Sequence, residues 1–228
     1  MKFSDAYYGV KKIYLAEILK LISSIAMFIA AAVIETAKTT GDIEAATETG
    51  NMGFMSGLVL AAGVLALIAL IIEIIGVRRA SWDEPSFKKA LSWLFIGIVV
   101  NILQSGFQNW NELVASLMSI LSVISELLVT IFVCRGIIIL AETLRNKTVA
   151  TLGRKTIRRL ITVQIIGLIA RLAALIGTAL TSEADMAFSV LSVTALILSA
   201  AGSVISIAAY LIYLKTLRKG RDMLENHG

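Results

Sequence analysis

Hydrophobic residues are gathered into six long runs along the chain, and short polar segments separate them. A helix crosses the hydrocarbon core of a bilayer with about 20 consecutive apolar residues. Every run approaches or exceeds that length, and the single proline, Pro85, lies in a polar segment. The pattern therefore predicts an all-α, polytopic membrane protein with six transmembrane helices. The expected spans are residues 13–37, 54–77, 90–108, 113–144, 160–180 and 186–217.

The polar segments alternate in charge. Lysine and arginine are concentrated before the first span, in the second and fourth connections and after the last span. The other three connections contain a single basic residue, Lys38. Because basic segments stay in the cytoplasm, both termini are predicted to be cytoplasmic. Residues 2–12 are amphipathic and are expected to lie in the membrane interface. In the fourth connection, Gly153 is expected to break the helix before the fifth span.

This topology predicts one membrane domain, residues 1–228, with no soluble domain. The domain consists of three consecutive helical hairpins, at about residues 13–79, 87–145 and 157–219. We expect a multi-pass protein of the cell membrane, most simply the cytoplasmic membrane of a bacterium.

Composition agrees with a membrane protein and leaves little material for catalysis. Hydrophobic residues make up 57% of the chain and charged residues 16%, compared with about 25% charged residues in soluble domains. The only histidine is His227, and Cys134 is the only cysteine. We therefore expect no enzymatic activity, no metal site and no cofactor. The net charge of +5 comes from basic residues that flank apolar runs, so it indicates topology rather than nucleic-acid binding.

The three spans that enter from the cytoplasm open in a similar way, each after a pair of basic residues. Equivalent offsets from these pairs fall on one helical face, which suggests a threefold repeat of the hairpin. The alternative is that any span entering from the cytoplasm begins with basic residues. The equivalent positions are Glu17, Leu94 and Gln164, then Lys20, Gly97 and Gly167, then Ser24, Asn101 and Arg171.

Small and polar residues form stripes on four of the predicted spans. They are Gly97, Asn101 and Gln104 on the third, Ser116, Ser119, Ser122 and Glu126 on the fourth, Gln164, Gly167 and Arg171 on the fifth, and Ser189, Ser192, Ser199, Ser203 and Ser206 on the sixth. One interpretation is helix packing, with interhelical hydrogen bonds worth about 0.6 kcal/mol each. The other is a polar cavity inside the bundle.

Arg171 is the most costly residue in these stripes. A charge at the centre of a span costs about 2.5–3.5 kcal/mol on insertion scales, so Arg171 is expected to face protein or water. Counted from the outer ends of their helices, Arg171 and Glu126 have similar depths and are candidates for a buried ion pair. Such a pair either fixes helix register or forms part of a ligand site. The candidate ligand-binding residues are Arg171, Glu126, Asn101, Gln104 and Gln164.

A second group of charges lies nearer the cytoplasmic boundary, where long side chains can pair or extend to water. We interpret it as a candidate interfacial charge network, made by Glu17, Lys20, Glu73 and Arg135.

The favoured function is a small-solute transporter, or the membrane-embedded solute-binding subunit of one, with a polar site at the midplane. Arg171 would contact an anionic small solute. One alternative is a structural or regulatory membrane protein that acts through a protein partner or a homo-oligomer, and a second is a channel. The expected surroundings are the lipid bilayer, without nucleic acid.

Overall fold

The structure, a computed structural model, describes residues 3–40, 51–107, 112–180 and 185–226, with side chains for residues 3–33, 56–107, 114–169 and 206–226. Within these ranges the chain forms helices and no strand. The helices are α1 (Ser4–Thr40), α3 (Asn51–Ala80), α4 (Pro85–Phe107), α5 (Glu112–Thr143), α6 (Lys147–Leu180) and α7 (Asp185–Asn226).

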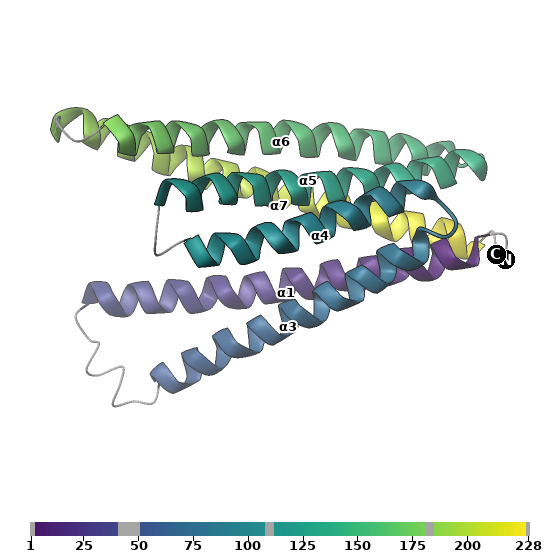
Figure 1. Cartoon of the computed structure of the whole chain (residues 1–228), viewed down its shortest axis with the longest axis horizontal. Helices are drawn as coiled ribbons and strands as arrows, with labels where there is room; N and C mark the ends of the chain where they lie inside the picture. The colour runs from purple at the N-terminus through teal and green to yellow at the C-terminus, as the bar shows by residue number, and fades with distance from the viewer. Residues whose placement is uncertain (1–2, 41–50, 108–111, 181–184, 227–228) are drawn as a thin grey trace.

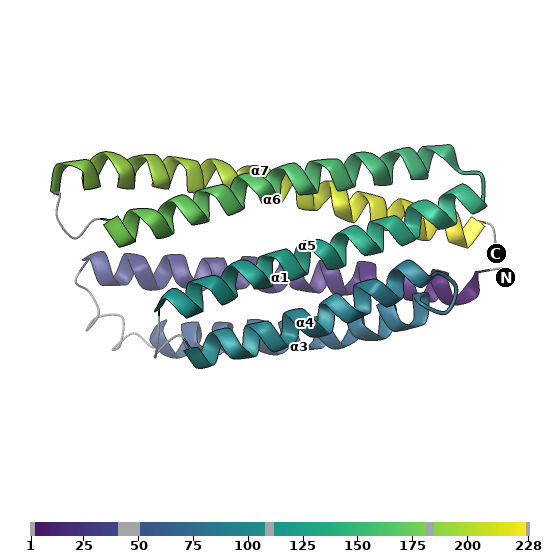
Figure 2. The same cartoon turned by 45° about the horizontal axis from the view of Figure 1, so that its top comes forward.

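These helices run lengthwise in an elongated bundle (Figures 1 and 2). Neighbours in the chain pack as α1 with α3, α4 with α5 and α6 with α7, and further contacts join α5 to α6 and α1 to α7. Both chain termini lie at one end of the bundle (Figure 1), which we call the termini end. The end of the bundle where α1 finishes and α3 begins is called the far end.

Among the residues whose side chains the structure describes, four helices contain stretches that are long and apolar enough to cross a membrane. They are Ser4–Val33, Ser56–Ala80, Pro85–Phe107 and Val114–Thr143, with mean hydropathies between 1.7 and 3.0. Large apolar side chains on these helices are left outside the bundle, such as Phe28 at 75% exposure and Leu60 at 70%. Such a surface suits lipid rather than water. The protein is therefore all-helical and membrane-embedded.

The first helix begins earlier than the sequence pattern predicted. Residues near its start do not lie apart in an interface, because Ala6, Tyr7 and Val10 are buried in the core of the bundle. The backbone N–H of Ala6 donates to the carboxylate of Asp83 at 2.7 Å. This bond satisfies one of the free N–H groups that every helix start presents. The turn after α3 thereby fixes the beginning of α1.

The expected break at Gly153 is also wrong, because α6 starts at Lys147 and continues through this glycine. Asn146 caps the helix start, since its side-chain oxygen accepts the N–H of Val149 at 3.2 Å. A Cβ on Gly153 would lie 2.6 Å from Cγ1 of Ile138 on α5. The glycine therefore permits close packing of α5 on α6 rather than ending a helix.

Helices α1 and α3 approach each other closely at Gly9 and Gly76. A Cβ on Gly9 would lie 2.6 Å from the carbonyl oxygen of Gly76 and 2.6 Å from the Cβ of Ala80. Two of the three nearest atoms are backbone atoms, which cannot move without shifting a helix. Small residues allow this approach of two helices in membrane proteins.

Gly9→Ala is therefore expected to lower the free energy of unfolding by about 1–3 kcal/mol, the usual cost of overpacking. Gly63→Ala is the matched control, because nothing lies within 4 Å of a Cβ at Gly63 on α3. Alanine has a higher helix propensity than glycine, so Gly63→Ala should leave the free energy of unfolding unchanged or slightly higher. Unfolding in mixed detergent micelles would measure both variants. Equal effects of the two substitutions would contradict the close contact.

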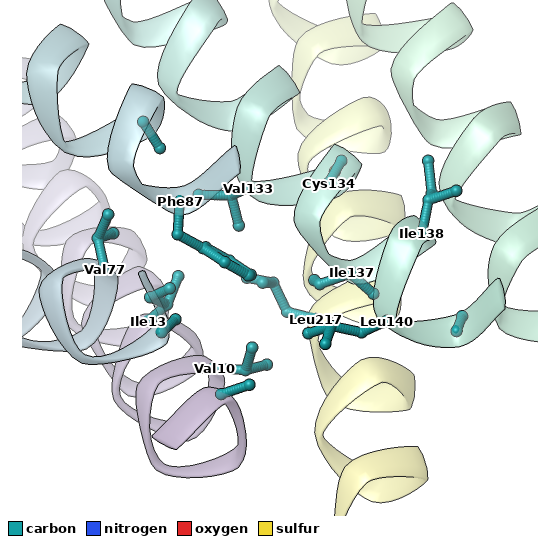
Figure 3. Close-up of a cluster of buried hydrophobic side chains, with 14 of the residues drawn as sticks. Val10, Ile13, Val77, Phe87, Val133, Cys134, Ile137, Ile138, Leu140 and Leu217 are labelled. Carbon is teal, nitrogen blue, oxygen red and sulfur yellow. The ribbon is translucent and has the colours of Figure 1, made fainter. Parts of the chain in front are cut away.

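At the termini end, an apolar plug fills the centre of the bundle (Figure 3). Each member is at most 2% exposed, and Phe87 of α4 lies among residues from α1, α3, α5 and α7. The termini end of the bundle is therefore tightly packed. Its members are Val10, Ile13, Val77, Phe87, Val133, Ile137, Leu140 and Leu217.

Candidate functional site

A cavity of about 590 Å³ lies in the middle of the bundle, and every described helix contributes to its wall. It adjoins the packed end, because Leu94, Val129 and Tyr213 belong both to the buried core and to the cavity lining. Pockets that bind small molecules usually measure about 300–1,000 Å³. The polar and aromatic lining residues are Glu17, Lys20, Ser23, Ser24, Glu73, Trp93, Asn101, Ser122, Ser125, Glu126, Thr130, Gln164, Ser206, Tyr210 and Tyr213.

Lys20 is the centre of a charged group at one side of the cavity. Its Nζ lies 3.2 Å from Oε1 of Glu17, one turn earlier on α1, and 2.6 Å from Oε2 of Glu73 on α3. The side chains of Glu17 and Glu73 are only 7% and 4% exposed, whereas that of Lys20 is 30% exposed. One ammonium group thus pairs with two buried carboxylates. The three side chains together carry a formal charge of −1.

Tyr210 attaches α7 to the same group. Its hydroxyl lies 2.6 Å from Oε2 of Glu17 and 2.8 Å from the backbone carbonyl oxygen of Glu17, and it can donate to either. Each oxygen of the Glu17 carboxylate therefore has a partner, one in Lys20 and the other in Tyr210. Three helices, α1, α3 and α7, are joined by these contacts, which fix the wall of the cavity.

The opposite wall consists of α4 and α5, joined by hydrogen bonds of small polar side chains. The Ser122 hydroxyl donates to Oδ1 of Asn101 at 2.9 Å, and the Asn101 amide donates to the carbonyl oxygen of Gly97 at 2.9 Å. The Ser125 hydroxyl donates to the carbonyl oxygen of Trp93 at 2.7 Å. Helix packing therefore uses part of the polar stripes, but Asn101 and Ser122 still face the cavity.

Glu126 on α5 is the third carboxylate of the lining. Its side chain is exposed, and the residues with described side chains provide it with no hydrogen bond or ion pair. Its backbone carbonyl oxygen accepts the hydroxyl of Thr130 at 3.0 Å, a bond that does not involve the carboxylate. Glu126 thus presents an accessible negative charge to the cavity.

The predicted partner of Glu126, Arg171, has a side chain outside the described residues, so their pairing stays a prediction. The helix of Arg171 is described, and Gln164 on that helix lines the cavity together with Glu126. Seven residues of helix place the backbone of Arg171 about 10 Å beyond Gln164, toward the far end.

The remaining predicted residues are placed as follows. Glu126, Asn101 and Gln164 from the predicted ligand site line the same cavity as Glu17, Lys20 and Glu73 from the predicted charge network. The structure thus brings most members of the two groups into one site. Gln104 is half-buried on α4 and Arg135 is exposed on α5, and neither lines the cavity.

Sequence reasoning missed Tyr210 and Trp93, which were not among the predicted site residues. A signal for Tyr210 exists in the spacing of the sixth stripe. Ser199, Ser203, Ser206 and Tyr210 follow one another at intervals of four, three and four residues, which places them on one helical face. A similar signal exists for Trp93, which stands four residues before Gly97 and eight before Asn101, so it extends the stripe of the third span by one helical turn.

No protein-family model, curated protein or solved structure matches this chain. Among the residues that the structure describes, no group of three histidine, cysteine, aspartate or glutamate side chains is arranged to hold a metal ion. The described lining instead offers carboxylates, one ammonium group, hydroxyls, amides and aromatic rings around a space of small-molecule size.

Proposed function

We propose that this protein binds a small solute in the central cavity and acts as a membrane transporter, or as the membrane-embedded solute-binding subunit of one. The observation that carries the proposal is the cavity of about 590 Å³, lined by four ionisable side chains of Glu and Lys in the middle of an otherwise apolar bundle. Charged groups inside a membrane are costly and usually mark a substrate or ion pathway. Helix packing alone does not require a space of this size with charged side chains in its wall.

In this proposal the chain crosses the cytoplasmic membrane of a bacterium six times, as three hairpins with both termini in the cytoplasm. The orientation rests on the basic residues of the termini end, which include Arg78, Arg79, Lys88, Lys89, Arg154, Lys155, Arg218 and Lys219. The apolar plug then lies between the cavity and the cytoplasm. The solute would enter from the far end, and transport would require the plug to repack.

The test uses a pair of neighbouring substitutions on α4. Asn101→Trp places a large side chain in the cavity, whereas Ile102→Trp places the same side chain on a surface that is 65% exposed. Thermal unfolding is followed while a small-molecule extract of the host cell is added to the purified protein. A solute at about 100 times its Kd should stabilise the wild type and Ile102→Trp by about 2.7 kcal/mol, and Asn101→Trp much less.

The alternative functions predict a different result. A channel or a protein that acts through a partner or homo-oligomer gains nothing from the extract, and its response does not depend on Asn101. Asn101→Trp also loses the hydrogen bond that Ser122 donates to Asn101, so its fold needs a separate check. Size-exclusion chromatography shows whether this variant still folds. Equal stabilisation of both variants would place the solute outside the cavity.

A further inference from the structure

We infer that the ligand of the central cavity is a small organic cation, such as a substituted ammonium ion. This inference rests on the proposed function and adds the chemical class of the solute. It follows from the charge balance, the size and the surface chemistry of the cavity.

The described lining contains three carboxylates and one ammonium group, a formal charge of −2. Lys20 is already shared between Glu17 and Glu73, so its positive charge is used within the wall. Glu126 has no side-chain partner among the described side chains. A lining with an excess of one sign of charge attracts ligands of the opposite sign. The described lining therefore favours a cationic ligand.

The formal negative charge of the described lining also disfavours an anionic solute, which the sequence had predicted as the partner of Arg171. An anion in the cavity would meet three carboxylates, and the one described cation, Lys20, already has two anionic partners. The backbone of Arg171 lies about 10 Å farther along α6 than Gln164, which marks the cavity wall.

Size and lining favour an organic cation over a bare metal ion. A volume of about 590 Å³ is much larger than one metal ion requires, and the described residues do not group into a metal site. Two tyrosines and Trp93 line the cavity beside the carboxylates. Aromatic rings attract organic cations, and quaternary ammonium groups in particular, through their electron-rich faces.

Two sets of probes with similar shapes and different charges test the inference. The first is choline, 3,3-dimethylbutan-1-ol and 3,3-dimethylbutanoate, and the second is butylammonium, butan-1-ol and butanoate. Binding to the full-length protein in nanodiscs is measured by calorimetry. We expect the cation of at least one set to bind more tightly than its neutral and anionic counterparts by about tenfold or more.

Glu126→Gln should weaken binding of that cation by about tenfold, because it removes one accessible negative charge. Glu142→Gln is the matched control on the same helix, with the same change in net charge at an exposed position that pairs with Arg154. It should leave cation binding unchanged. Preference for the neutral or anionic probe would overturn the cation inference and leave the solute site standing. If none of the six probes binds, the result counts against both proposals. If the two variants have equal effects on binding, Glu126 has no role in binding the cation.

Discussion

Lys20→Met is expected to lower the free energy of unfolding by about 3 kcal/mol, near the lower limit for breaking a buried ion pair. The substitution removes the only described positive charge beside Glu17 and Glu73, whose side chains are 7% and 4% exposed. Two carboxylates would then share a water-poor wall without a counter-ion. The lower limit applies because 30% of the Lys20 side chain is exposed, so water already screens part of the interaction. Denaturation in mixed detergent micelles measures the change.

Two control variants separate charge from packing at this position. Lys20→Arg keeps the positive charge and should be much less destabilising. The triple variant Glu17→Gln, Lys20→Met, Glu73→Gln removes all three charges together, and most of the lost stability should return, because a neutral replacement for a buried ion pair is often tolerated. If Lys20→Met unfolds with the wild-type free energy, the charged group does not stabilise the bundle.

Phe87→Ala is expected to destabilise the protein by about 3–5 kcal/mol, the usual cost of deleting a buried aromatic ring. Phe87 is 0% exposed and is the largest side chain in the apolar plug. Its ring lies close to α5, since a Cβ on Gly136 would be 2.5 Å from Cε2 of Phe87. Truncation would leave a cavity in the tightly packed end of the bundle, where five helices meet.

Phe95→Ala is the matched control for this prediction. Phe95 lies on the same helix as Phe87, but its side chain is 50% exposed on the outside of the bundle. Phe95→Ala should lower the free energy of unfolding much less, because the deleted ring contacts lipid or detergent and not a packed core. The two variants are compared by the same micelle denaturation. Similar losses would mean that the plug is not the main apolar core.

Much of the architecture follows from the sequence because apolar runs dominate it. The helical, membrane-embedded nature of the chain needs only the length and hydropathy of these runs. Helix ends were less predictable. The start of α1 depends on a hydrogen bond from Ala6 to Asp83, which is 77 residues away in the chain. The path of α6 through Gly153 depends on the position of Ile138 on another helix.

The sequence pointed to several polar residues that line the cavity, but it missed Tyr210 and Trp93 and did not show how the residues are grouped. The expected depth in the membrane grouped Glu17, Lys20 and Glu73, whereas the polar stripes placed Glu126 and Asn101 in another group. Their convergence on one cavity depends on how α1, α3, α4 and α5 are rotated, which a single sequence does not specify. Helical periodicity defines which residues share a face, but it does not define which faces meet.

Native mass spectrometry of the protein, purified from its own membrane in mild detergent, shows whether the central cavity binds a solute. Our account predicts one bound small molecule per chain on the wild type and on Ile102→Trp, and none on Asn101→Trp. The same small molecule on all three proteins, or a bound protein partner without any small molecule, would contradict a solute site in the central cavity.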